Sequence, residues 1–347
     1  MSHHVDLGSL VKAYAGGSRD SSLLVSIARG LLRAGAALTA PDGSRRTALH
    51  FFNEAFARQP QLRERHRADY FSSIALGPYV RGDGVSESDL RAALRGPSVR
   101  SRDLTAYVLD FIRDTDAGRA LVELKEDNVE RHIPSLFKSK LLQVALETIP
   151  VADWKIEQGL ALVRRTLLTA ALDQSALPTT DISRLSVSLA IQCLHNEFIY
   201  RATGAERRDA DILAKSVAAD IASAVRIDRF AIAVLASYGQ LRDRLPGVAH
   251  DQLPSGLEKL VRLHFLEPQE EARLASSIPS LTTVADPTSR AVRAQYEHNP
   301  FPTWSHARTA AHGLSVQAWL TAAFGWVPSF LRLPEYSSAD STRQRII

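Results

Sequence analysis

The sequence predicts an all-α protein, a multi-helix array that is either a degenerate tetratricopeptide-like stack or a helical bundle. Alanine, leucine and arginine dominate the 347 residues, and runs of β-branched residues are rare. Most segments of roughly 12 to 18 residues carry apolar side chains three and four positions apart, which is the period of an α-helix. With 45% apolar and 23% charged residues, the chain has the composition of a globular protein and not of a disordered or collagen-like one.

The first part of the chain predicts short helices separated by loops. Residues 21–37 and 47–58 each carry one apolar stripe, and Pro60 stops the second of these helices. Residues 77–101 are richer in glycine, proline and serine, and they predict loops around one short helix that starts in the sequence SESD.

Longer helices are predicted from residue 133 onward. Asp153 is a candidate N-cap, and Trp154 falls on the expected buried side of the helix that begins there. The helix over residues 185–200 is apolar nearly all round, which predicts a central helix covered by several neighbours. The predicted helices in this part span residues 135–148, 153–172, 185–200, 210–225, 229–238 and 253–266.

The pattern divides the chain into three regions. Residues 1–128 form a divergent helical region, and residues 129–268 form a helical middle domain. Residues 269–347 form a Pro-rich connector, where we expect extended chain between short helical turns. The prolines behind this prediction are Pro268, Pro279, Pro287, Pro300 and Pro302.

Charge and cysteine content narrow the class of protein. The net charge is +4 and the pI about 9.3, but the basic residues are spread along the chain, so the sequence does not predict nucleic-acid binding. The single cysteine, Cys193, excludes an intrachain disulfide and a cysteine-based zinc site, which indicates the cytoplasm. The amino terminus does not resemble a signal peptide, and polar residues interrupt the apolar runs at 185–200 and 314–333, so no membrane span is predicted.

No catalytic motif identifies an enzyme, a cofactor loop or a metal site in this sequence. The chain contains no HExxH, GxSxG, GxxxxGK or GxGxxG element. Cys193, His195 and Glu197 lie close in sequence, but residues two apart on a helix point in different directions, so Cys193 and His195 are not expected to pair. We interpret Cys193 as a buried structural residue, and the catalytic residues are unknown.

The strap, residues 295–304 with the sequence QYEHNPFPTW, is the most unusual stretch. Prolines on both sides of Phe301 predict an extended backbone that projects Phe301 and Trp304 as anchors. Tyr296, Glu297 and Asn299 offer polar groups for contacts near a substrate or cofactor. The alternative is a purely structural connection between the helical region and the residues after the strap.

The strap resembles the QYEENPYPRW element of bacterial proteins that join a helical amino-terminal region to a methyltransferase domain dependent on S-adenosylmethionine. Residues 190–200, AIQCLHNEFIY, are similar to the ALQCFLNEYVY helix of that family. Residues 266–282 are similar to its EPxEExxLxxxIPxLT stretch. The resemblance covers residues 130–304, and the departures in the strap are His298, Phe301 and Thr303.

The resemblance implies S-adenosylmethionine as the cofactor of the family, bound by a glycine-rich loop that comes after the strap. No such loop occurs before the end of this sequence at Ile347, so we expect no cofactor to be bound by this chain alone and no methyl transfer by it. The implied partners are a methyltransferase catalytic domain, in cis or in trans, or a protein substrate.

Three functions remain open at this point. The chain is the helical recruiting or regulatory region of a methyltransferase-like protein, a stand-alone adaptor that binds other proteins, or an enzyme whose dispersed active site no motif reveals. An aromatic amphipathic helix predicted over residues 314–333 supports the first two, because its apolar face needs a partner to cover it.

Overall fold

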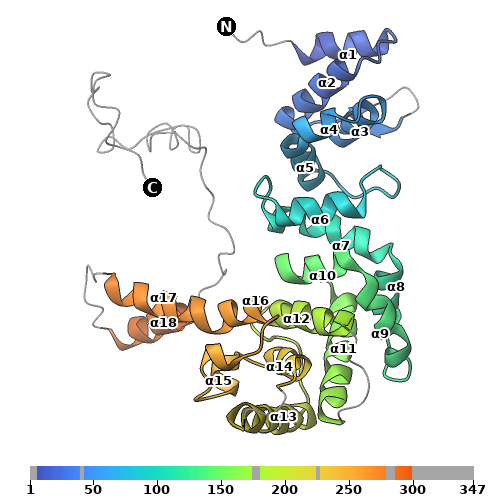
Figure 1. The fold of residues 1–347 in the computed structure, drawn as a ribbon. Helices are drawn as coiled ribbons and strands as arrows, with labels where there is room; N and C mark the ends of the chain where they lie inside the picture. Colours follow the sequence, from blue (N-terminus) through green and yellow to red (C-terminus); the bar gives the residue numbers. More distant parts are fainter. Residues whose placement is uncertain (1–5, 40–42, 174–179, 224–226, 279–285, 299–347) are drawn as a thin grey trace. The chain divides into compact units, whose positions relative to one another are not determined.

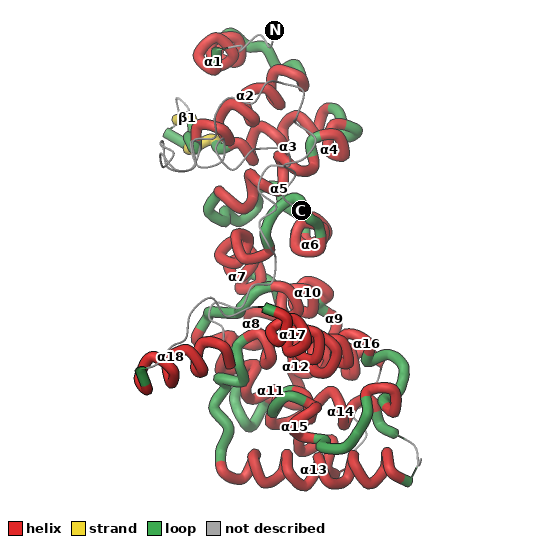
Figure 2. Tube along the Cα trace, turned by 90° about the vertical axis from the view of Figure 1, so that its left-hand side faces the viewer, coloured by secondary structure: helices red, strands yellow, loops and turns green. Residues whose placement is uncertain are grey.

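The computed structural model describes residues 6–39, 43–173, 180–223, 227–278 and 286–298. Contacts divide the chain into two units, Met1–Leu281 and Thr282–Ile347, with the boundary inside the predicted Pro-rich connector. Nearly all the regular structure in the described residues is helical (Figure 1), which confirms the predicted all-α class. The exception is a short hairpin of β1 (Leu38–Thr39) and β2 (Arg45–Arg46) (Figure 2).

The helices succeed one another with short connections. Before residue 128 they are α1 (Leu7–Ala15), α2 (Ser21–Ala34), α3 (Ala48–Arg58), α4 (Leu62–Arg65), α5 (Arg67–Leu76), α6 (Glu87–Arg95), the 3₁₀-helix η1 (Ser101–Leu104), α7 (Thr105–Arg113) and α8 (Asp116–Glu123). After residue 128 they are α9 (Val129–Lys138), α10 (Lys140–Thr148), α11 (Trp154–Asp173), α12 (Thr180–His195), α13 (Gly204–Ala222), α14 (Arg229–Ala236), α15 (Leu241–Arg244), the 3₁₀-helix η2 (His250–Gln252), α16 (Glu258–Val261), the π-helix η3 (Arg262–Leu266), α17 (Glu267–Ser277) and, in the second unit, α18 (Pro287–His298).

Capping residues fix several helix starts where the sequence predicts them. The Asp153 carboxylate accepts hydrogen bonds from the backbone N–H groups of Lys155 and Ile156 at 3.0 and 3.1 Å, which starts α11. Ser86 and Asp89 form a reciprocal capping box at α6. At the other end of α2, Gly35 adopts a left-handed conformation with φ of 60°, which ends that helix.

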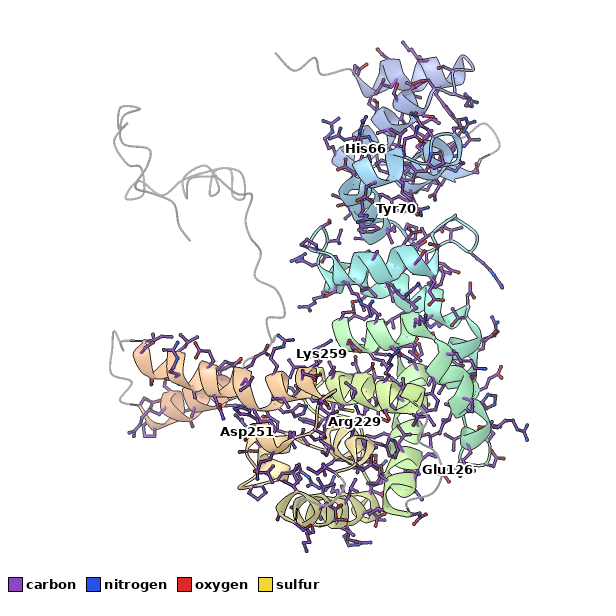
Figure 3. All side chains as sticks on the ribbon, in the orientation of Figure 1. His66, Tyr70, Glu126, Arg229, Asp251 and Lys259 are labelled. Carbon is purple, nitrogen blue, oxygen red and sulfur yellow. The ribbon has the colours of Figure 1, made fainter. Side chains whose placement is uncertain are left out.

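One hydrophobic core runs through the first unit, from Leu24 on α2 to Phe265 in η3. In the amino-terminal helices it is aromatic, because Tyr70 (Figure 3) packs its ring against Phe52, Phe56 and Phe71. Helices α8 and α9, which lie on either side of residue 128, pack against each other.

Helix α12 is central, as its apolar sequence predicts, because it packs against α9, α10, α11, α14 and α16. Its buried Gln192 amide donates to the carbonyl oxygens of Leu146 and Ile149 and accepts from the Val151 N–H, at 2.9 to 3.1 Å. Gln192 therefore satisfies backbone groups that α10 leaves unpaired at its end. Lys259 (Figure 3), on α16, forms an ion pair of 2.7 Å with Glu147 on α10.

Three helix predictions in the middle of the chain are wrong in their boundaries. The helix predicted over residues 135–148 is divided at Ser139, whose hydroxyl accepts from the Leu142 N–H at 3.2 Å and thereby starts a new helix. The helix predicted over 185–200 ends at His195. The helix predicted over 253–266 begins at Glu258 and changes to π-helical geometry before it continues into α17.

The prediction that Trp154 is buried is also wrong, because its side chain is 72% exposed. Trp154 lies about 120° around the α11 axis from the buried Leu160. Gln158, one turn further along the same face, is exposed as well. The indole therefore lies outside the buried face of the helix.

The connector contains longer helices than predicted. Helix α17 has 11 residues and α18 has 12, where the prolines predict extended chain between short turns. Pro287 is the first residue of α18, a position where proline removes no internal hydrogen bond. Pro268 is the second residue of α17 and directly follows π-helical η3, so the helical run continues through it. The other three prolines of the prediction lie outside the described residues.

Candidate anion-binding pocket

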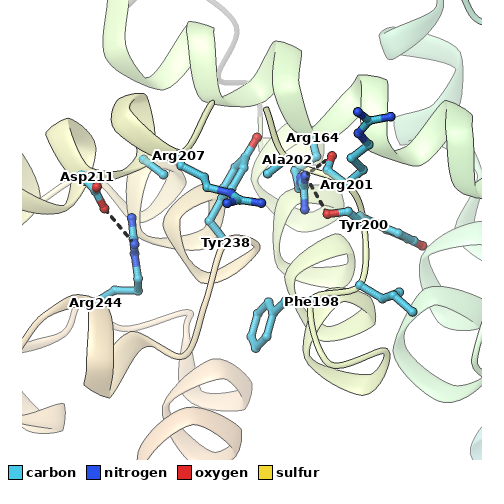
Figure 4. Close-up of a pocket in the computed structure, with 11 residues that line it drawn as sticks. Arg164, Phe198, Tyr200, Arg201, Ala202, Arg207, Asp211, Tyr238 and Arg244 are labelled. Atoms are coloured by element: carbon cyan, nitrogen blue, oxygen red, sulfur yellow. Dashed lines mark hydrogen bonds and ion pairs between the residues drawn. The ribbon is translucent and has the colours of Figure 1, made fainter. Parts of the chain in front are cut away.

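A cavity of about 420 Å³ opens where α11, α13, α15 and the segments after α12 and α14 meet (Figure 4). We call it the arginine pocket. Its lining residues are Arg164, Phe198, Ile199, Tyr200, Arg201, Ala202, Arg207, Ala210, Asp211, Tyr238 and Arg244. Its volume is within the usual range for a small-molecule site.

A sharp turn at the end of α12 forms one wall of the arginine pocket. Glu197 and Phe198 both adopt left-handed backbone conformations, with φ of 56° and 58°. The Phe198 N–H donates to the Cys193 carbonyl at 2.7 Å and closes the turn. Glycine normally occupies such positions, so two consecutive side chains here carry backbone strain. The turn places Phe198, Ile199 and Tyr200 along the cavity.

Arg164 holds the back of the arginine pocket together. Its side chain is 2% exposed, and its Nη2 donates to the carbonyl oxygens of Tyr200 and Arg201 at 3.4 and 3.1 Å. The same nitrogen lies 3.5 Å from a Glu206 carboxylate oxygen, and the guanidinium carbon lies 4.4 Å from the centre of the Tyr238 ring. One side chain on α11 thus contacts the turn after α12, the start of α13 and the end of α14.

Glu206 is buried and has several donors. It caps α13 by accepting from the Thr203 N–H at 2.9 Å, and it accepts from the Tyr238 hydroxyl at 3.1 Å. Burial would raise the pKa of Glu206, but the Thr203 N–H and the guanidinium groups of Arg164 and Arg165 lower the pKa below its ordinary value. Glu206 is therefore a carboxylate at neutral pH and neutralises Arg164.

The remaining arginines of the arginine pocket are less fully paired. Arg244 forms an ion pair of 2.9 Å with Asp211, while its Nε and Nη2 atoms are buried without a hydrogen-bond partner. Arg201 and Arg207 are exposed, and within the described part of the chain no acidic group forms an ion pair with either. In Figure 4 the Arg207 side chain extends toward Tyr238 and Arg164, whereas Arg201 extends away from them.

This arrangement can bind an anion. A guanidinium group presents paired N–H donors that match a carboxylate or a phosphate, and Phe198 and Tyr238 supply apolar surface beside it. The arginine pocket lacks a nucleophile with an adjacent base, because its only carboxylate, Asp211, is already paired with Arg244.

The structure describes the predicted strap residues only in part. Tyr296 lies on α18 and is 63% exposed, and Glu297 follows it in the same helix. Asn299, Phe301 and Trp304 lie outside the described residues, as does the predicted aromatic helix over 314–333. The proposed contacts of these five strap residues with a substrate or cofactor remain predictions.

The predicted burial of Cys193 is confirmed. Cys193 is fully buried on α12, and burial raises the pKa of its thiol to about 12 although Arg164 lowers it in part. A thiol with this pKa is not a nucleophile at neutral pH. Glu197 lies in the exposed turn beyond the end of α12.

The described residues contain neither a metal site nor the glycine-rich element that the resemblance associates with S-adenosylmethionine. No group of three or more histidine, cysteine or acidic side chains is placed to hold a metal ion within that part of the chain. The two-residue strands β1 and β2 are its only strands, so it has no strand that opens into a glycine-rich cofactor loop. No described helix is long and apolar enough to cross a membrane.

Comparisons with protein families, curated proteins and solved structures find no match to this chain.

The arginine pocket is not predicted from the sequence, although one residue of it carries a signal. Arg164 occupies the same face of α11 as Leu160, Val163 and Leu167, which are buried. A charged residue in an apolar stripe indicates a buried ion pair or a binding site. Most of the other pocket residues lie in loops or on exposed helix faces, where residue types follow no pattern.

Proposed function

We propose that this chain is a helical recognition module that binds an anionic group of a substrate or partner in the arginine pocket. One observation carries the proposal: Arg207 points into a cavity that Arg164 and Arg244 also line, and it has no ion-pair partner among the described residues. An uncompensated guanidinium beside apolar walls is the arrangement that protein sites use for carboxylates and phosphates.

The resemblance of the strap and of residues 190–200 to methyltransferase-type proteins supports a biological setting for this binding. In that setting the module works in the cytoplasm and recruits a methyl acceptor for a catalytic domain that acts in cis or in trans. S-adenosylmethionine binds to that domain and not to this chain. Tyr296, Glu297 and Asn299 then contact the recruited substrate near the catalytic domain.

Thermal unfolding in the presence of anions tests the proposal. We expect at least one class among monocarboxylates, dicarboxylates and phosphate monoesters to raise the melting temperature in a saturable manner at constant ionic strength. A ligand at 100 times its dissociation constant adds about 2.7 kcal/mol to the free energy of unfolding. The Arg207→Gln variant should lose most of this increase, because it loses the uncompensated positive charge.

Arg208→Gln is the matched control. Arg208 is the next residue on α13 and is exposed, but it does not line the arginine pocket. Its variant should respond to anions as the wild type does. Failure of every anion class to stabilise the wild type, or equal stabilisation of wild type and Arg207→Gln, would reject the proposal.

A second candidate function is that of a stand-alone protein-binding adaptor, and α17 carries the observation that favours it. Leu274 and Ile278 lie four residues apart at its end and are exposed, as is Leu266 just before it. An adaptor that binds through this apolar face would lose its partner on Leu274→Ser substitution and would keep it on Arg207→Gln substitution.

A further inference from the structure

We infer that the arginine pocket selects a monocarboxylate attached to an apolar or aromatic body over a phosphate monoester. This inference rests on the proposed function and names the ligand class of the same site. It depends on three features of the pocket: the ion pairs that already neutralise Arg164 and Arg244, the apolar side chains that a ligand can contact, and the Arg207 side chain that points into the cavity.

The charges inside the arginine pocket match a ligand with a single negative charge. Glu206 neutralises Arg164 at 3.5 Å, and Asp211 neutralises Arg244 at 2.9 Å. Arg201 and Arg207 are the two lining arginines without an ion pair among the described residues, and of these only Arg207 points toward the other arginines in Figure 4. A carboxylate carries one negative charge at pH 7, whereas a phosphate monoester carries about 1.5 to 2.

Asp211 also disfavours a more highly charged ligand. Its carboxylate is part of the cavity wall and is 61% exposed, so an anion in the pocket lies near this carboxylate as well as near Arg244, whose charge the carboxylate balances. The repulsion grows with the charge of the ligand. A monoanion that contacts Arg207 tolerates this neighbour better than a dianion does.

The apolar walls favour a ligand with a hydrophobic body. Ile199 lines the cavity and is 74% exposed, and the rings of Phe198 and Tyr238 line it as well. Contact with an aromatic or aliphatic group would remove this surface from water, which inorganic anions cannot do. The planar guanidinium of Arg207 would meanwhile hold the carboxylate through two parallel hydrogen bonds.

Two sources supply this chemistry, a small organic acid and the carboxyl terminus of a peptide that ends in an apolar residue. Isothermal titration with 3-phenylpropionate, phenyl phosphate, 3-phenylpropionamide and a short peptide ending in phenylalanine separates them. We expect 3-phenylpropionate to bind the wild type about tenfold more tightly than phenyl phosphate, and the neutral amide to bind at least tenfold more weakly than the acid. Tighter binding of the peptide than of the small acid would assign the peptide terminus as the source, and the reverse order would assign the organic acid.

Variants test the cause of the selectivity. Arg207→Gln should weaken 3-phenylpropionate binding about tenfold, and Arg208→Gln should not. Asp211→Asn removes a carboxylate from the cavity wall and leaves Arg244 without its ion-pair partner. The added positive charge should strengthen phenyl phosphate binding more than 3-phenylpropionate binding, so that the preference for the carboxylate becomes smaller. Because Asp211 is on the surface, this variant should keep the fold, which a circular dichroism spectrum checks.

The outcomes distinguish the two proposals. Tighter binding of phenyl phosphate than of 3-phenylpropionate, or equal binding of the acid and its amide, overturns the carboxylate inference. Tighter binding of phenyl phosphate would still agree with the proposed recognition of an anion. Absence of binding by every anion, together with no thermal stabilisation, overturns the proposed function itself.

Discussion

His264 is a buried histidine whose environment fixes its neutral form. Its Nδ1 atom accepts a hydrogen bond from the Leu241 N–H at 3.2 Å, so the ring must be unprotonated at this nitrogen. Burial lowers the pKa of His264 to about 4, and the nearby Arg242 acts in the same direction. The ring lies in the π-helical turn η3 and links that turn to the start of α15.

We expect His264 to make stability depend on pH. In the unfolded chain the pKa of histidine is about 6.5, so between pH 4 and 6.5 the unfolded state binds a proton that the folded state does not. The free energy of unfolding that depends on the neutral His264 is fully present above about pH 6.5, and it decreases as the pH falls toward 4. At pH 5 the loss is about 2 kcal/mol in the free energy of unfolding.

Urea unfolding at pH 7.5 and pH 5 measures this effect in the wild type and in His264→Gln. The wild type should lose more stability between the two pH values than the variant, since glutamine does not titrate. His50, His66 and His195 also have lowered pKa values through burial, so the difference between the two proteins isolates His264. Exposed His250, replaced by Gln, is the control. An unchanged pH difference in His264→Gln would contradict the assignment.

At the scale of single residues, the sequence predicts some environments and not others. The burial of Cys193 follows from its position in an apolar helix, and the capping role of Asp153 follows from its position just before a helix. The exposure of Trp154 contradicts the prediction, because the helical period places its side chain about 120° around the axis from Leu160 and so outside the apolar stripe. Arg164 is a charged residue at a buried position within an apolar stripe. Its burial is explained only by the partners that surround it, above all Glu206.

At the scale of elements, the crossing of α8 and α11 depends on a glycine. A Cβ atom at Gly159 would overlap the carbonyl group of Leu121, so the absence of a side chain lets the two backbones approach closely. The carbonyl belongs to the α8 backbone and cannot turn away as a flexible side chain could. This close approach brings α8 against the helix that carries Arg164.

We expect Gly159→Ala to destabilise the protein by about 1 to 3 kcal/mol, although alanine favours helices more than glycine does. Gly204→Ala is the matched control, because the nearest atom to a Cβ there is a guanidinium nitrogen of Arg208 at 3.6 Å. Chemical unfolding compares the two variants. If Gly159→Ala were as stable as Gly204→Ala, the close contact between α8 and α11 would be refuted.

Periodicity predicts the existence of helices better than their ends. Helices α2, α3, α11 and α14 lie within a few residues of their predicted ranges. The division between α9 and α10 does not follow from periodicity, because Ser139 interrupts no apolar period and acts only by capping α10. The lengths of α17 and α18 do not follow from the prolines, because Pro287 begins its helix and the helical run continues through Pro268.

At the scale of the whole molecule, the arginine pocket could not be predicted because its walls come from separate helices. Arg164, Phe198, Arg207 and Arg244 are spread over 80 residues of sequence, and the fold brings them together. The class of fold follows from composition and periodicity, which are local. The pocket depends on which helices pack against each other, and no local pattern determines this.

The packing also indicates that stability is shared among neighbouring helices and not among all of them. Helices α11 and α13 pack against each other, as do α11 and α14, whereas α2 packs against α1, α3 and α5. In such arrays each segment responds mainly to its neighbours, and segments can open separately. The Arg164 contacts join α11, α13 and α14, so their loss should act locally.

We therefore expect Arg164→Met to increase hydrogen–deuterium exchange in α13 and α14 and to leave exchange in α2 and α3 unchanged. Removal of Arg164 leaves the buried Glu206 carboxylate with only the partly exposed Arg165 as a cation, and the loss of one partner costs about 3 to 5 kcal/mol in buried pairs. Arg165→Met is the comparison: Arg165 contacts the same Glu206 carboxylate at 3.4 Å but is itself 40% exposed, so water can replace its charge and its loss should cost less than the loss of Arg164. Mass spectrometry of peptides from both regions gives the comparison. Equal increases in α2 and α13 would show that the first unit opens as one cooperative structure, because the loss of a contact at one end would then be transmitted through the whole core.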